Sequence, residues 1–536
     1  MKRFWVVVAF LGFLFVLNDA LAQGKMERGK IVVSIYDDFV NKKSEVKYFL
    51  QRKDTTLIPV PMEQLRDFPP PHSGQRAILS PNGKLRYPRN KAGIPFNKIS
   101  GEINVLIALI QPSGEDAPWE AEKAVEYFQS SKDFFEDPKQ HSKITLSVKT
   151  VGWVKSQKTT SDFLKNGKNG DINFVVVIKE AISIIDNTVD FSKIDCLFVV
   201  VADSNYTLLG GASTLGSWLF QTNDGHLNFS GVALNAATFS YWPVINSHEL
   251  GHTLGLWHGA GANTARKNNC GYQNSEAEEY YDAFTLMGST YSLLPTWIQY
   301  LFGWLPKERV INLSVSASVE LHPREIANAD GKQLVIVETY NGNEYFTLEV
   351  YVKKLESYFY TNNIKDDSLL ILRRHNGVVK SNRGGYDSVV FLHETNDYES
   401  FLRPGEEICG LGPKGDISIK YVSLEGEGEN ARVKVEVSMP EPTPTPSPSP
   451  SPSPSPTPTP TPTPTLCEAT TISVDPKLLK LTKKNSGEVT VTITSADGCA
   501  VEGETVTATI NKAGNKRVAI SPSSGETDEN GQATFT

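Results

Sequence analysis

The stretch from His248 to His258 reads HELGHTLGLWH and contains three histidines at fixed spacing around one glutamate. On an α-helix, residues four apart lie on the same face, so His248 and His252 can direct their imidazoles to a single cation. Gly255 lacks a Cβ and can adopt a left-handed φ, which ends the helix and turns the chain so that His258 reaches the same cation. Three neutral imidazoles leave the fourth position of Zn²⁺ open, as in catalytic zinc sites.

Glu249 follows the first histidine and lies near the same edge of the predicted helix. A carboxylate at this position can hold the water that a metal ion polarises and can act as a general base. A bare HExxH arises by chance in roughly one such chain in a hundred, and the added Gly and third His lower this to about one in a hundred thousand. The sequence therefore predicts a zinc hydrolase with Glu249 as its catalytic base.

The longer pattern HExxHxxGxxH is the metzincin signature, and this chain resembles the metzincin zinc proteases. Those proteins have a methionine turn beneath the metal, and Met287 in YYDAFTLMGS fits it because it follows the third histidine and precedes Gly288. The resemblance implies that Met287 forms an apolar floor and does not coordinate the metal. Tyr291 is a candidate metal contact, although its offset of four residues from the methionine differs from the usual two.

The segments HELGHTLGLWHGAG, YYDAFTLMGS and LFGWLP, together with KITLSVKTVGWV upstream, resemble the gametolysin family of metzincins. The resemblance covers about residues 100–439 and implies a zinc endopeptidase that cleaves extracellular proteins or cell-wall glycoproteins. Asp282 is the single aspartate of the methionine segment, which is usually Asp-rich. The acidic cluster Glu276, Glu278 and Glu279 is interpreted as a solvated loop, with a Ca²⁺ site as the alternative.

The net charge bears on the class of partner, and the first residues predict export. The 536-residue chain has a formal net charge of −8 and so lacks the basic character of a general nucleic-acid binder. Residues 1–22 combine a basic start, an apolar run over 4–17 and the sequence ALA, which together predict a cleaved signal peptide. No later stretch is apolar enough to cross a bilayer. We expect a mature chain without a transmembrane span, secreted or extracellular at the cell surface.

The five cysteines are an odd number, so an exported chain leaves at least one thiol unpaired or paired outside the sequence. Cys467 and Cys499 lie close together and are candidates for a disulfide bond, whereas Cys270 is interpreted as a loop or buried cysteine. No cysteine precedes Cys196, so residues 23–100 cannot block a metal with a thiol. Two readings of that region stay open: a prosegment that blocks the cleft through another group, or an N-terminal β-domain.

Composition and strand patterns divide the chain further. Pro alternates with Thr or Ser over 440–465, which predicts an extended polyproline spacer. Beyond it the sequence ETDENGQATFT resembles bacterial Ig-like domains of the invasin and intimin type. This last region stops on a predicted strand and is shorter than the roughly 100 residues of such sandwiches, so the domain is incomplete or the chain is a fragment.

The predicted fold class is an α+β metzincin catalytic domain, with a twisted mixed sheet and an active-site helix, followed by β-sandwich domains. The predicted domains are a signal peptide (1–22), a prosegment or β-domain (23–100), a catalytic domain (101–306), a β-rich domain (307–439), a spacer (440–465) and an Ig-like domain (466–536).

Two functions are compatible with these features. One is an endopeptidase that acts on a protein or peptide substrate, with the C-terminal region attaching it to the cell surface or to its substrate. The other is a surface adhesion or binding protein with a vestigial protease domain. Glu249 favours the enzyme, because a metal site used only for binding does not need it.

Overall fold

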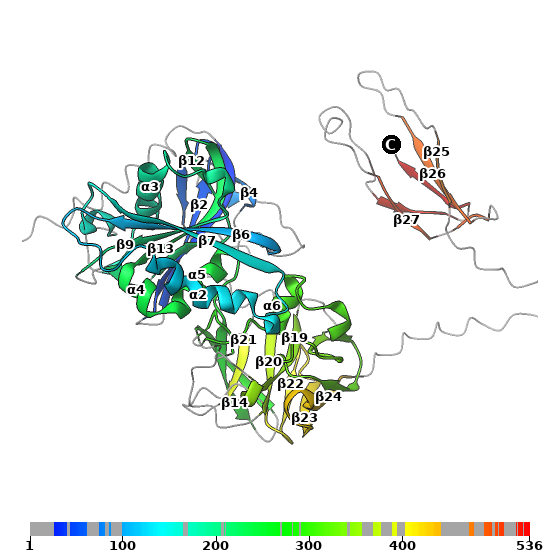
Figure 1. Ribbon diagram of the computed structural model, residues 1–536. Helices are drawn as coiled ribbons and strands as arrows, with labels where there is room; N and C mark the ends of the chain where they lie inside the picture. The colour runs from blue at the N-terminus through cyan, green and yellow to red at the C-terminus, as the bar shows by residue number, and fades with distance from the viewer. Residues whose placement is uncertain are drawn as a thin grey trace, which may run out of the picture. The chain divides into compact units, whose positions relative to one another are not determined.

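The computed structural model of the chain divides into two compact units, Met1–Thr443 and Pro444–Thr536 (Figure 1). The predicted signal peptide at 1–22 and the spacer beyond Pro440 lie outside the described residues. The structure describes residues 26–39, 43–61, 74–80, 85–86, 99–164, 170–204, 208–209, 211–267, 271–280, 282, 284–288, 291–339, 344–355, 368–376, 389–393, 402–440, 471–475, 487–495, 499–501, 503–508, 521, 524–528 and 530–535.

The first unit contains a sheet with the main order β3-β2-β1-β11-β13-β9-β6-β7, in which β12 pairs with β13, and β4 pairs with β1 and β5. Its strands are β1 (Glu27–Asp38), β2 (Lys43–Gln51), β3 (Leu57–Val60), β4 (Arg76–Leu79), β5 (Leu85–Arg86), β6 (Gly101–Gln111), β7 (Ile144–Lys155), β9 (Cys196–Val201), β11 (Gly211–Thr214), β12 (Trp218–Thr222) and β13 (Gly225–Asn235). The central strand β9 reads CLFVVV and is buried throughout, because parallel strands flank it and helices cover both faces of the sheet. A separate short pair joins β8 (Gly170–Asp171) and β10 (Leu208–Leu209).

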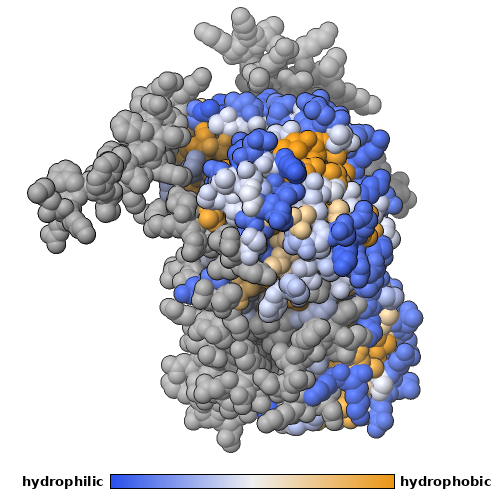
Figure 2. All heavy atoms as spheres, turned by 60° about the vertical axis from the view of Figure 1, so that its left-hand side comes forward, coloured by the Kyte–Doolittle hydropathy of each residue, from blue (hydrophilic) through white to orange (hydrophobic). Residues whose placement is uncertain are grey.

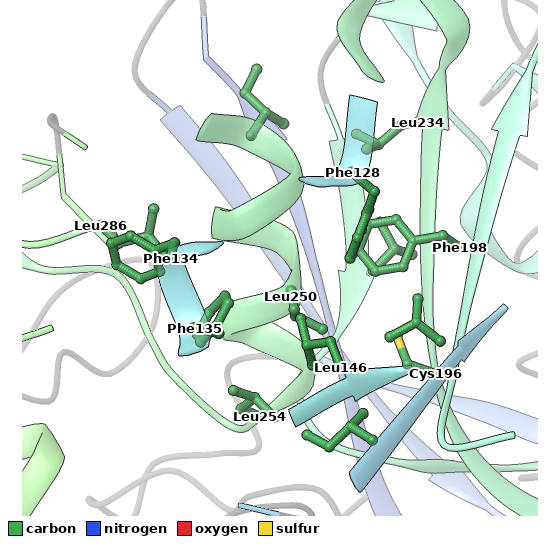
Figure 3. Close-up of a cluster of buried hydrophobic side chains, with 14 of the residues drawn as sticks. Phe128, Phe134, Phe135, Leu146, Cys196, Phe198, Leu234, Leu250, Leu254 and Leu286 are labelled. Atoms are coloured by element: carbon green, nitrogen blue, oxygen red, sulfur yellow. The ribbon is translucent and has the colours of Figure 1, made fainter. Parts of the chain in front are cut away.

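Helices pack on both faces of this sheet. They are α2 (Lys123–Glu136), α3 (Phe174–Ile185), α4 (Ala236–Tyr241) and α5 (Pro243–Thr253), and α6 (Thr296–Leu301) follows later in the chain. Helix α3 packs on one face, whereas α2, α4 and α5 lie together on the other (Figure 1). Figure 3 shows Leu250 of α5 and Leu254, directly after the helix, in one cluster with Phe135, Leu146 and Cys196, so the helix with the histidine motif is anchored on the core of the sheet.

A second sheet of the same unit has the order β16-β18-β19-β20-β21-β14-β15-β22-β23-β24-β17. Its strands are β14 (Ala260–Lys267), β15 (Gly271–Glu279), β16 (Val310–Leu313), β17 (Ala317–Leu321), β18 (Leu334–Glu338), β19 (Glu344–Val352), β20 (Ser368–Asn376), β21 (Val389–His393), β22 (Glu407–Leu411), β23 (Ile417–Glu425) and β24 (Arg432–Ser438). Alternating buried residues of β17, β23 and β24 form much of its core.

The fold class predicted from the sequence is wrong. The described residues form 29 strands and only five α-helices, and strands dominate both units. Two long-range pairings explain the difference. Strand β1 inserts between β2 and β11, so residues upstream of 100 belong to the same sheet as β6 and β9. Strands β14 and β15 follow the third histidine at once and pair with β21 and β22. The helical region is therefore not a self-contained α+β domain followed by separate sandwiches.

The second unit consists of short strands, β25 (Thr471–Asp475), β26 (Val489–Thr494), β27 (Thr505–Thr507), β28 (Ser524–Glu526) and β29 (Gln532–Phe535). They form a three-stranded sheet, β25-β26-β29, and the pair β27-β28. Cys409 and Cys499 are in disulfide bonds, whereas Cys196 is free and buried. Cys270 and Cys467 lie outside the described residues, so the predicted pairing of Cys467 with Cys499 stays a prediction.

The described surface is mixed in character. On the face seen in Figure 2, hydrophilic residues surround separate apolar patches. Over the described part of the chain, none of the helices combines the length and the apolar character needed to cross a membrane.

A buried ion network joins the second sheet to the segment that contains the predicted methionine turn. Arg373 on β20 donates from Nε to Asp282 Oδ2 at 2.9 Å and from Nη1 to Glu349 on β19. Arg324 donates from Nη1 to the carbonyl oxygen of Phe284 at 2.8 Å and to Glu349 Oε1 at 3.1 Å. Burial alone would raise the pKa of Glu349, but the two guanidinium groups lower it to about 2. The Asp282 carboxylate thus accepts a hydrogen bond from the buried Arg373 guanidinium.

Replacing Arg373 by Met should destabilise the first unit strongly. The substitution leaves the Asp282 carboxylate buried without its cation, and breaking such a pair costs about 3–5 kcal/mol. Denaturant unfolding of the full chain would measure the loss. Arg374→Met is the matched control, because its half-buried side chain points to the other face of β20, and we expect a change of about 1 kcal/mol or less. Equal effects of the two substitutions would contradict the role given to Arg373.

Candidate metal centre

Helix α5 begins at Pro243, which is favoured in a first helical turn, and ends at Thr253. Gly255 follows with a φ of 104°, and its N–H donates to the carbonyl oxygen of His252. This left-handed residue turns the chain, and His258 comes back to the helix face that carries His248 and His252. The structure thus brings the three predicted ligands together, and each is at most 3% exposed.

The three Nε2 atoms are close enough to share one ion. The distance from His252 Nε2 to His258 Nε2 is 3.0 Å, and that from His258 Nε2 to His248 Nε2 is 3.2 Å. Two nitrogen ligands of a tetrahedral zinc ion, each about 2.0–2.1 Å from the metal, lie about 3.3 Å apart. The spacing of the imidazoles therefore fits a tetrahedral metal site.

Asp37, at the end of β1, completes the cluster and was missed by sequence reasoning. Its Oδ2 lies 3.2 Å from His252 Nε2 and 3.5 Å from His248 Nε2, and its Oδ1 lies 3.2 Å from His258 Nε2. The side chain is fully buried. Among the described residues, Asp37 and the three histidines are the one group of His, Cys, Asp or Glu side chains arranged to hold a metal ion. Asp37 lies 211 residues before His248, and no local spacing links the two.

Backbone carbonyl groups orient two of the imidazoles. Nδ1 of His248 lies 3.0 Å from the carbonyl oxygen of Leu286, and Nδ1 of His252 lies 2.6 Å from that of Leu256. A carbonyl oxygen can only accept, so both Nδ1 atoms carry the hydrogen, and the lone pair of each ring is on Nε2. This is the tautomer that a ligand to metal needs, held by the kind of outer contact that metal-binding histidines usually have.

Burial and mutual interaction set the charge of the donors. Burial lowers the pKa of His252 to about 4, so its imidazole is neutral near pH 7. Burial alone would raise the pKa of Asp37, but the adjacent imidazoles of His258, His248 and His252 hold it well below its usual range. The Asp37 carboxylate and the neutral His252 imidazole are in the protonation states that bind a divalent cation.

Glu249 is fully buried, and no hydrogen bond of good geometry reaches either carboxylate oxygen from the described residues. The carboxyl group lies directly against Gly211 of β11, where a Cβ would collide with Oε1. Burial raises the pKa of Glu249 well above its usual range, the charge of Asp37 raises it further, and the Ser213 hydroxyl lowers it only in part. Burying a carboxyl group without good hydrogen bonds costs free energy of folding, and such groups are concentrated at functional sites.

The structure also locates the other predicted residues. Met287 is buried, and its Sδ lies so close to α5 that a Cβ on Gly251 would approach it to 2.5 Å. Tyr291 directs its hydroxyl to the carbonyl oxygen of Ser130 at 3.0 Å. The Tyr280 hydroxyl instead reaches the cluster and donates to Asp37 Oδ1 at 2.6 Å.

The Tyr280 backbone has a φ of 64°, which is uncommon for a residue with a side chain. Its ring centroid lies 4.2 Å from that of His258. Sequence reasoning missed Tyr280, because its place depends on the chain reversal after β15 and not on a motif. The side chains of the acidic residues of β15 lie outside the described set, so the Ca²⁺ site stays a prediction.

The donor set fits a divalent metal ion. Two features support this: the spacing of the four donors, and buried carboxyl groups whose charge a cation would offset. The cluster of one aspartate and three histidines can therefore bind a metal.

Comparisons with known proteins give little further guidance. No protein-family model matches the chain, and no curated protein matches it. Two similar solved structures are a catalytically inactive OgpA from Akkermansia muciniphila in complex with an O-glycopeptide (glycodrosocin) substrate and metalloproteinase-II from Bacteroides fragilis. The first is 12% identical, with 54% of this chain and 93% of that chain covered and a TM-score of 0.21. The second is 14% identical, with 45% and 85% covered and a TM-score of 0.19. These TM-scores are too low to support an inference about this chain.

Replacing His258 by Ala should weaken zinc binding by more than about 100-fold. Even the loss of a group that only orients a metal ligand lowers metal affinity by about 10–100-fold, and a ligand itself contributes more. Zinc content after dialysis, followed by competition with a chelating dye, would measure the change. His226→Ala is the control, since His226 is exposed on β13. Zinc affinity equal to that of the unmodified chain in the His258 variant would show that this imidazole is not a ligand.

Proposed function

We propose that this chain is a zinc-dependent endopeptidase. The proposal rests on one observation: three buried imidazoles converge on a point beside Glu249, a buried carboxyl group to which the described residues give no hydrogen bond of good geometry. The resemblance of the motif segments to the gametolysin family supports the same activity. Zinc is the expected metal, because imidazole and carboxylate donors at this spacing suit it.

Bound zinc would supply Lewis acidity, lowering the pKa of a coordinated water and polarising the scissile carbonyl group. Glu249 would take a proton from the attacking water and later deliver it to the leaving amine. Its raised pKa favours this role, because a carboxylate with a higher pKa takes a proton more readily than an exposed one. The carbonyl groups of Leu286 and Leu256 would keep two imidazoles fixed during the reaction.

The substrate would be an extracellular protein or a cell-wall glycoprotein, as the gametolysin resemblance implies. Residues 1–22 support export, and the spacer with the Ig-like region would hold the enzyme at a surface or on its substrate.

A second candidate is a binding protein with a structural metal site. Asp37 favours it, because four protein ligands close a zinc site and such closed sites are usually structural. Glu249 opposes it, since a structural site gains nothing from a second buried carboxyl group that makes no hydrogen bond of good geometry to the residues the structure describes.

The decisive variant is Asp37→Ala, which leaves three imidazoles. We expect its zinc-loaded full chain to cleave denatured casein and a mixed peptide library, with products identified by mass spectrometry. Adding Glu249→Gln should lower cleavage by about 100-fold or more at unchanged zinc content, because general base catalysis contributes about 10²–10⁴-fold.

Chelation should abolish the cleavage, and added zinc should restore it. The endopeptidase proposal fails if the zinc-loaded Asp37→Ala chain cleaves nothing, or if the double variant cleaves equally well. The first outcome would leave the structural metal site as the better account.

A further inference from the structure

A pocket of about 680 Å³ lies at the beginning of β1, where this strand meets the end of β2, strand β4 and Leu219 of β12. Pockets that bind small ligands usually have volumes of about 300–1,000 Å³. Lys30 lines the pocket, and Asp37 lies seven residues further along the same strand. At about 3.3 Å per residue, the two positions are roughly 23 Å apart. The pocket is therefore separate from the metal centre.

Positive charge is concentrated around this pocket. Among the ten described residues that line it, five are cationic and none is acidic. The cationic residues are Arg28, Lys30, Arg52, Lys53 and Arg76. The chain as a whole has a formal net charge of −8, so this concentration runs against its average character. A cavity lined by one sign of charge focuses the electric field and attracts ligands of the opposite charge.

Four of the five cations are not neutralised by described residues. Arg52 is held by Glu27, because its Nε donates to Oε2 at 2.9 Å and its Nη2 lies 2.6 Å from Oε1. None of the other four makes an ion pair with a residue that the structure describes. Long cationic side chains without anionic partners leave the rim of the pocket free to pair with an anionic ligand.

Two of these cations are placed where they repel each other. Lys30 and Arg76 are directly opposite in the antiparallel pairing of β1 with β4. The Cβ atoms of directly opposed residues are about 4.5–5.5 Å apart, and like charges at such positions destabilise a sheet. An anion between the two side chains would remove this repulsion. The arrangement is therefore unfavourable for folding and favourable for binding an anion.

The pocket also has a fixed floor with apolar surface, to which Ile78 and Leu219 contribute. The buried Gln51 amide holds Leu219 in place: its Nε2 donates to the carbonyl oxygen of Leu219 at 2.9 Å, and its Oε1 accepts from the N–H of Leu219 at 2.9 Å. Gly29 lets β1 approach the end of β2, because a Cβ there would collide with the carbonyl oxygen of Gln51. The floor is formed before a ligand binds, which lowers the entropic cost of binding.

We propose that this pocket binds an acidic oligosaccharide, in which sugar rings carry carboxylate or sulfate groups. The C–H groups of the rings lie on the apolar floor, and the anionic groups pair with Arg28, Lys30 and Arg76 at the rim. The site goes beyond the proposed endopeptidase function and does not depend on it. In an exported protein, it would hold the chain on an acidic polysaccharide outside the cell.

The floor and the lining disfavour other anions. An inorganic anion would pair with the cations but leave the apolar floor uncovered. An acidic peptide would bring backbone N–H and C=O groups against apolar surface, which is unfavourable where they lack hydrogen-bond partners. Single-stranded nucleic acids are bound by stacking of their bases on aromatic side chains, and none of the described residues that line the pocket is aromatic.

Isothermal titration calorimetry of the full chain tests the class of ligand. The probes are tetragalacturonate, a heparin-derived tetrasaccharide, neutral maltotetraose and acetyl-tetraglutamate amide, which carries as many carboxylates as tetragalacturonate. At least one acidic sugar should bind about 10-fold or more tightly than tetraglutamate, because the peptide leaves polar groups without partners. Binding of tetragalacturonate would assign carboxylated sugars to the pocket, and binding of the heparin fragment alone would assign sulfated sugars. Maltotetraose or tetraglutamate binding as tightly as both acidic sugars would overturn the proposal.

Lys30→Gln tests the place of binding. It should weaken binding of the acidic sugar by about 10-fold or more, because it removes a charged hydrogen-bond donor. It should not lower the free energy of unfolding, because it also removes the repulsion with Arg76. Lys43→Gln is the matched control, since Lys43 is exposed at the opposite end of β2 from the pocket, and its affinity should equal that of the unmodified chain.

Equal affinities in the unmodified chain and both variants would contradict the assignment, because the sugar would then be held elsewhere, as at the metal centre. A loss of stability in Lys30→Gln that matches its loss of binding would also contradict it, since Lys30 would then act through the fold.

Discussion

Two buried carboxyl groups beside three buried imidazoles are the constraint on which the arrangement of this protein depends. Removing a carboxylate from water costs several kcal/mol unless a cation or hydrogen bonds compensate. Asp37 receives partial compensation from the imidazoles and from Tyr280, whereas none of the described residues gives Glu249 a hydrogen bond of good geometry. A cation at the centre of the donors would offset both charges. The cluster can therefore bind a metal ion, and the surrounding elements hold its donors in place.

The local part of the site could be predicted from the sequence because it depends on spacing along one helix. The separations of His248, His252 and His258, with Gly255 between the last two, dictate the convergence that the structure contains. Asp37 could not be found in this way, because its place depends on the pairing of β1 with β11. A strand pattern predicts that a segment is extended, but it does not identify the partner strand.

The error in fold class has the same cause. Strands β14 and β15 read AGANTARK and GYQNSEAEE, with little of the apolar alternation by which strands are recognised. Their pairing with β21 and β22 incorporates the chain after His258 into the second sheet. That sheet also reaches the metal centre through Arg324, which donates to the carbonyl oxygen of Phe284 in the segment that orients His248. The β-rich part of the unit thus supports the site directly.

The donors differ in how firmly they are held by the rest of the fold. His248 and His252 belong to α5, whose Leu250 is anchored in the core, and their Nδ1 atoms are fixed by carbonyl groups on two further segments. Asp37 is held at the end of a strand by a four-residue pairing, and one of its contacts is Tyr280, a residue with an unfavourable positive φ. Movement of α5 would disrupt the main core. The two imidazoles of α5 are consequently the donors that the fold holds most firmly.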